Sequence, residues 1–158
     1  MPTKLPGLSD AHHIAIANVA SRAAQLDYHI ETTVARALAK QPETAEFLLK
    51  SLDMNRIVTL LKTLLLDLIP EEKTAITNVI AEITELRSDR NGILHWTWVG
   101  VGGTNETVAA AVSRRPFQEF RHAMRTAEEI QEIANLMQNA SHALMEWQQL
   151  LHRRVHGT

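Results

Sequence analysis

The chain has 158 residues, of which 45% are hydrophobic and 22% charged, a composition that suits one folded domain with its own core and excludes an intrinsically disordered chain. It holds no cysteine, which excludes disulfides, iron–sulfur clusters and cysteine-ligated zinc. The net charge of −2 argues against a protein that coats nucleic acid, although residues 86–126 hold six Arg against three Asp or Glu.

The sequence carries no targeting or membrane signal that we recognise. No run approaches the ~18 apolar residues of a membrane span. The segment Met1–Gly7 lacks the apolar stretch of a secretory signal. We therefore expect a cytoplasmic protein that does not enter the membrane. We also expect one helical domain over residues 1–158, with residues 1–8 as a flexible N-terminus.

The first part of the chain has the apolar spacing of three and four that is typical of helices. Ser9 or Asp10 can cap the first helix, and Asp53 can cap the third. Pro42 and Pro70 each suit the first turn of a helix. The sequence therefore predicts four helices in this part, over about 9–40, 42–52, 53–68 and from 70 onward.

Beyond His95 the pattern changes to one that is typical of strands. Trp96–Val101 is aromatic and β-branched, Gly102–Asn105 is a turn cluster, and Thr107–Val112 can return as a second strand. Pro116 can then restart a long helix. The sequence therefore predicts an all-α antiparallel bundle of four to five helices, with a small β-hairpin inserted after the fourth helix.

The fourth helix carries two arginines where its spacing asks for aliphatic residues. The apolar stripe through Ile80 and Ile83 continues at the same spacing to Arg87 and Arg90. An unpaired buried guanidinium is costly, so these side chains should face a cleft, an anion or an acidic partner.

Two interpretations of these arginines stay open. Asp27 and Glu31 lie four residues apart on the first helix and are candidate ion-pair partners for Arg87 and Arg90. A carboxylate at this place could instead be an auxiliary catalytic acid. We favour the structural pairing.

The six residues Arg90-Asn91-Gly92-Ile93-Leu94-His95 resemble the signature of the HEPN superfamily. That signature is an Arg, a polar residue that is often Asn, a few spacers and then His. The aromatic segment Trp96-Thr97-Trp98 and the long helices before and after the motif are also similar to those of many bacterial members. If the helix persists to His95, Asn91 and His95 share one of its sides.

The resemblance implies a fold, an activity and a role for each motif residue. Active HEPN proteins are metal-independent endoribonucleases that work as dimers, with two motifs in one composite cleft. His95 would be the general acid–base or would orient the 2′-hydroxyl, Arg90 would hold the scissile phosphate, and Asn91 would position the phosphate or the histidine. The ordinary pKa of histidine and the forked donors of arginine suit these roles. No cofactor and no metal is expected.

Further residues near the motif are candidates for contact with RNA. Trp96 and Trp98 share one strand face and could stack on bases, although packing against a helix or a second subunit is favoured. Four arginines are predicted to bind the RNA backbone, with a solvated helix face as the alternative: Arg87, Arg114, Arg115 and Arg121.

The sequence as a whole predicts a homodimeric HEPN-type endoribonuclease that cuts RNA. It could act as a toxin or defence enzyme with an antitoxin or regulatory protein as partner. Other members of the superfamily use the fold without cleavage. The alternative is therefore a non-catalytic dimerisation or RNA/nucleotide-binding module.

Overall fold

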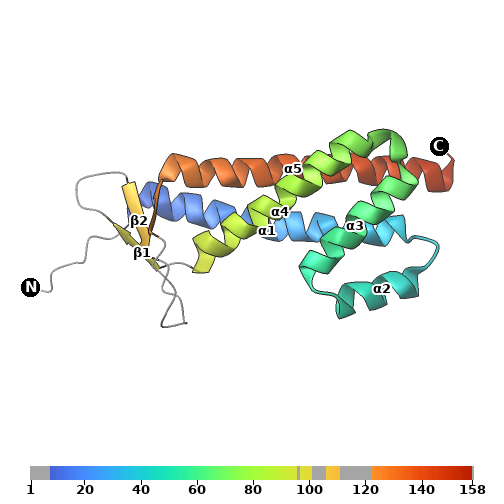
Figure 1. Cartoon of the computed structure of the whole chain (residues 1–158), viewed down its shortest axis with the longest axis horizontal. Helices are drawn as coiled ribbons and strands as arrows, with labels where there is room; N and C mark the ends of the chain where they lie inside the picture. The colour runs from blue at the N-terminus through green and yellow to red at the C-terminus, as the bar shows by residue number, and fades with distance from the viewer. Residues whose placement is uncertain (1–7, 96, 101–105, 111–121, 158) are drawn as a thin grey trace, which may run out of the picture.

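The computed structural model describes residues 8–95, 97–100, 106–110 and 122–157 (Figure 1). These residues form five α-helices, one short 3₁₀ helix and three β-strands. In chain order the elements are α1 (Asp10–Ala37), α2 (Pro42–Ser51), α3 (Met54–Leu68), η1 (Pro70–Glu72), α4 (Lys73–His95), β1 (Thr97–Gly100), β2 (Glu106–Ala110), β3 (His122–Thr126) and α5 (Ala127–His156).

The first helices begin at the caps that the sequence predicts. The Ser9 side chain accepts a hydrogen bond from the backbone N–H of His12 at the start of α1. Asp53 accepts one from the N–H of Arg56 at the start of α3. Each bond satisfies a donor that the helix itself leaves without a partner. The helical content of the prediction is thus confirmed in this part of the chain.

The two longest helices, α1 and α5, lie side by side and run in the same direction (Figure 1). The Asn18 amide donates to Gln131 near the start of both helices, at 2.7 Å. The Gln148 amide donates to the Thr33 hydroxyl further along both, at 2.9 Å. The prediction of antiparallel packing is wrong for this pair. The fourth helix, α4, runs back toward the start of α1, so α5 begins beside that start (Figure 1).

One hydrophobic core runs through α1, α3, α4 and α5. In α4 the buried stripe passes through Leu86 and Ile93, which are 2% and 1% exposed, whereas Leu94 is 39% exposed. The buried stripe therefore continues from Ile83 to Leu86 and Ile93, and not to the two arginines as the spacing suggested. Arg87 and Arg90 flank the buried stripe rather than occupy its centre. Among the helices of the described residues, none is long and apolar enough to cross a membrane.

A three-stranded antiparallel sheet in the order β1-β2-β3 lies at the end of the bundle where α1 and α5 begin (Figure 1). The sheet has a third strand, β3, beyond the two that the sequence predicts, and α5 begins only at Ala127. The predicted turn at Gly102–Asn105 and the predicted helix start at Pro116 lie outside the described residues, as do Trp96 and the N-terminal segment 1–7.

Candidate functional site

The motif residues lie on the last turns of α4. The helix continues through Gly92 and ends at His95, so Asn91 and His95 are one helical turn apart and share one side of the helix. Gly92 lies in the final turn, where the low helix propensity of glycine costs less than in a helix interior. Both Asn91 and His95 are exposed.

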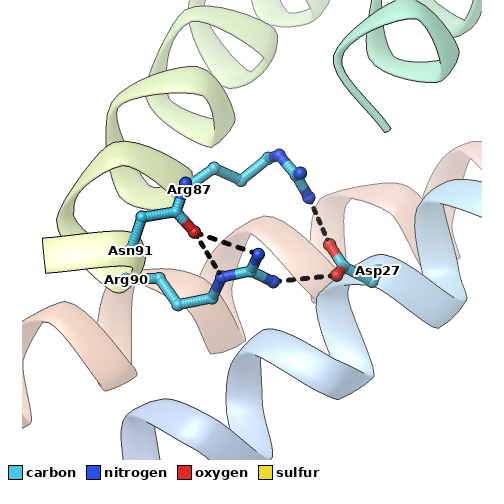
Figure 2. A network of polar contacts seen from close by, with 4 residues as sticks. All are labelled: Asp27, Arg87, Arg90 and Asn91. Carbon is cyan, nitrogen blue, oxygen red and sulfur yellow. Dashed lines mark hydrogen bonds and ion pairs between the residues drawn. The ribbon is translucent and has the colours of Figure 1, made fainter. Parts of the chain in front are cut away.

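Asp27 of α1 binds both arginines of α4 (Figure 2). Its Oδ1 accepts a hydrogen bond from Nη1 of Arg87 at 2.5 Å, and its Oδ2 accepts one from Nη1 of Arg90 at 3.0 Å. These three side chains are only 27%, 12% and 23% exposed for Asp27, Arg87 and Arg90. The expected pairing with Asp27 is therefore present, and Glu31 takes no part in it.

The Arg90 guanidinium binds Asn91 through a different edge from the one that binds Asp27. Its Nε–H and an Nη2–H both point at Oδ1 of Asn91, at 3.2 and 3.1 Å (Figure 2). This pair of parallel donors is the edge of arginine that binds phosphate in a bidentate manner. A neutral, exposed amide oxygen occupies it here.

The cluster carries an excess of positive charge. Two guanidiniums share one carboxylate, which leaves one positive charge beyond neutrality in a half-buried position. Burial lowers the pKa of Arg87, Asp27 raises it in part, and the positive charge of Arg90 lowers it again. Arginine stays protonated at physiological pH despite such shifts, so the excess charge persists.

His95 lies apart from this network. It makes no hydrogen bond or ion pair with the residues that the structure describes. It is five residues from Arg90, so the two side chains leave the helix about 140° apart. The neighbouring Ile93 carbonyl accepts a hydrogen bond from the Trp98 indole N–H at 2.7 Å, which ties β1 to the end of α4. Trp98 also packs against the core, as favoured from the sequence.

Arg87 is the one predicted RNA-binding arginine in the part of the chain that the structure describes. Arg114, Arg115 and Arg121 lie outside the described residues. Arg125 of β3 pairs with Asp89 of α4 at 3.5 Å, and its Nε is buried without a hydrogen-bond partner.

A groove between α3 and α4 adjoins the network and was missed from the sequence. Its volume is about 570 Å³. Its signal in the sequence is a polar stripe on α3, at the spacing of one helix face, beside the apolar face that marked α3 as a core helix. The groove is lined by Asn55, Val58, Thr59 and Lys62 of α3 and by Ile80, Thr84, Arg87, Ser88 and Asn91 of α4.

The described residues offer no metal site, and the comparisons with known proteins give no family for the chain. Among the described residues, no group of three or more His, Asp or Glu side chains is arranged to hold a metal ion. In comparisons with known proteins, no family model, no curated protein and no solved structure matches the chain. The proposed function therefore rests on the geometry of the site and on the motif that it contains.

Proposed function

We propose that the chain is a metal-independent endoribonuclease of the HEPN type that acts as a cytoplasmic homodimer. The observation that carries the proposal is the phosphate-binding edge of Arg90. Asp27 holds the guanidinium from one side through Nη1, while Nε and Nη2 meet only the amide oxygen of Asn91. A phosphate oxygen is a stronger acceptor than an amide oxygen because it is charged, so it can replace the amide without breaking the pair with Asp27.

The roles of the motif residues follow from this arrangement. Arg90 binds the non-bridging oxygens of the scissile phosphate and stabilises the charge that grows on them. The imidazole of His95 takes the proton from the 2′-hydroxyl, whose oxygen attacks phosphorus. The bond from phosphorus to the 5′-oxygen breaks, that oxygen takes up a proton from solvent, and His95 releases its own proton to solvent. The products are a 2′,3′-cyclic phosphate and a 5′-hydroxyl.

A dimer explains why Arg90 and His95 leave the helix in different directions. Within one chain their side chains diverge, so a single cleft would draw Arg90 and His95 from two copies. Two large apolar side chains are exposed next to the site, which favours an interface there. Tyr28 is 63% exposed beside Asp27, and Leu94 is 39% exposed beside His95.

The second candidate is a non-catalytic module that binds RNA or dimerises. The observation that favours it is the half-buried ion pair between Arg90 and Asp27. In this alternative the pair serves the packing of α4 on α1, and His95 has no chemical role.

Cleavage of end-labelled RNA in the presence of EDTA tests the proposal. We expect the wild-type chain to leave cyclic-phosphate ends. Loss of the acid–base group in His95→Ala or of the phosphate donors in Arg90→Ala should slow cleavage by about 100-fold or more. His13→Ala, which removes an exposed histidine of α1, is the matched control and should cleave normally. No cleavage of tRNA, rRNA and mRNA would favour the module, and cleavage that survives both motif changes would mean that the activity comes from a contaminant or from another site.

A role as a toxin or defence enzyme adds a cellular expectation. Expression of the wild-type chain should arrest growth, and His95→Ala should relieve the arrest. Harmless expression of the wild-type chain would argue against a toxin, and a partner that suppresses the arrest would be the expected antitoxin.

A further inference from the structure

The groove between α3 and α4 is built from two facing helix stripes. On α3 the lining residues recur at three and four, from Asn55 to Lys62, and on α4 they recur in the same way from Ile80 to Asn91. The stretch of α4 from Ile80 to Asn91 is about 17 Å long along the helix axis. His95 follows Asn91 by one turn on the same side of α4. The groove therefore leads along α4 toward the motif.

The walls of the groove favour an anion. Lys62 and Arg87 contribute positive charge, and none of the lining residues that the structure describes is acidic. The Nη1 of Arg87 is held by Asp27, whereas its Nε is buried without an acceptor. Lys62 forms no ion pair within the described part of the chain. A lysine without an ion pair, next to an arginine that shares its one carboxylate with Arg90, gives the groove an excess of positive charge that suits phosphate groups.

Two threonines point to a ligand with hydroxyl groups as well. The Thr59 hydroxyl donates to the Asn55 carbonyl, and the Thr84 hydroxyl donates to the Ile80 carbonyl. Since the hydrogen of each hydroxyl is already used, the oxygen is left to act as an acceptor. A ribose 2′-hydroxyl can donate to such an oxygen, and a deoxyribose cannot.

The size of the groove favours an RNA strand over a single phosphate ion as its ligand. Its volume of about 570 Å³ is in the range of pockets that hold whole organic ligands, and it greatly exceeds what one phosphate ion fills. We propose that this groove binds the RNA strand beside the scissile phosphate, with Lys62 and Arg87 on the backbone phosphates and Thr59 and Thr84 on the ribose. This inference rests on the proposed function, because it assigns the path of that enzyme's substrate.

The test measures binding separately from cleavage. Fluorescence anisotropy with labelled single-stranded RNA, on the His95→Ala chain so that bound RNA stays intact, gives the dissociation constant at several salt concentrations. Adding Lys62→Gln should weaken binding roughly three- to tenfold and reduce the slope of log K against log salt by about 0.7, the loss of one phosphate contact. Lys73→Gln is the matched control, since it removes the same charge from an exposed position of α4 outside the groove.

A second variant tests the ribose contact. RNA should bind more tightly than DNA of the same sequence, and Thr59→Val should reduce that difference while leaving DNA binding unchanged. Equal losses in Lys62→Gln and Lys73→Gln, or no RNA binding at all, would overturn the groove.

The outcomes for the groove and for the ribonuclease are distinguishable. RNA binding that depends on Lys62, with no cleavage by the wild-type chain, would support the groove as an RNA-binding site and contradict the proposed ribonuclease activity. Cleavage by the wild-type chain, with the same RNA affinity and KM in Lys62→Gln, would support the ribonuclease activity and contradict RNA binding in the groove.

Discussion

Asp27 neutralises one of two guanidiniums at a place that solvent reaches poorly. Its carboxylate lies between Arg87 and Arg90, both mostly buried, and so fixes where α4 sits against α1. A buried ion pair adds little net stability compared with a well-packed apolar pair, but removal of one partner is costly because the other charge stays buried. Here one removal would leave two like charges facing each other.

Asp27→Asn should therefore destabilise the fold by about 1–3 kcal/mol, a range below that of a fully buried pair because Asp27 is partly exposed. Urea denaturation followed by circular dichroism measures the change. Asp67→Asn is the matched control, since Asp67 is an exposed carboxylate on α3 without an ion pair in the described part of the chain. Similar midpoints for both variants would mean that Asp27 has no structural role.

His29 predicts a loss of stability in acid. Burial lowers its pKa below the usual 6.5, and the nearby His142 lowers it further. Above about pH 6.5 the histidine is neutral in both the folded and the unfolded chain and contributes nothing. As the pH falls from there toward the lowered pKa, the unfolded chain takes up the proton first, and stability is lost.

His29→Gln should therefore flatten the fall in the free energy of unfolding over that pH window. Urea titrations on both sides of pH 6.5 measure it. His13→Gln removes an exposed histidine and should keep the wild-type slope. The same fall in His29→Gln as in the wild-type chain would assign the acid sensitivity to other groups.

Helix ends were predictable where a capping side chain or a proline marks them. Ser9, Asp53 and Pro42 define the starts of α1, α3 and α2 in the structure as in the sequence. The sequence predicts the start of the last helix at Pro116, whereas α5 starts at Ala127, where the sequence carries a stronger capping signal. Thr126 and Glu129 form a capping box, in which each side chain binds the backbone N–H of the other residue.

Thr126→Ala should lower the free energy of unfolding by about 1 kcal/mol, because it leaves the N–H of Glu129 without its acceptor at the start of a long helix. Thr126→Ser keeps the hydroxyl and should retain most of the stability. Thermal unfolding measures both variants. Equal losses in the two would mean that the methyl group, not the cap, matters at the junction of β3 and α5.

At the scale of the whole molecule, the sequence predicted the helices better than their order in space. Apolar spacing locates the buried face of a helix, but it does not determine whether two helices pack parallel or antiparallel. The parallel pairing of α1 and α5 could therefore not be predicted. The ion pairs of Asp27 were predictable from charge and spacing, while the role of the motif stays a prediction. Arg90, Asn91 and His95 are close in sequence, and Asp27 was a candidate for its charge. The groove beside them depends on how α3 and α4 face each other, which only the fold determines.

The dimer of the proposed function makes a prediction that a monomeric enzyme does not share. In a mixture of Arg90→Ala and His95→Ala chains that exchange subunits freely, about half of the dimers combine one intact Arg90 with one intact His95 from the other chain. A cleft shared by two copies should then regain part of the ribonuclease activity, measured as release of cyclic-phosphate ends. Each variant alone should stay inactive, and sedimentation velocity should show that both remain dimers. If the mixed dimers form and stay inactive, Arg90 and His95 must act within one chain, and the composite cleft is wrong.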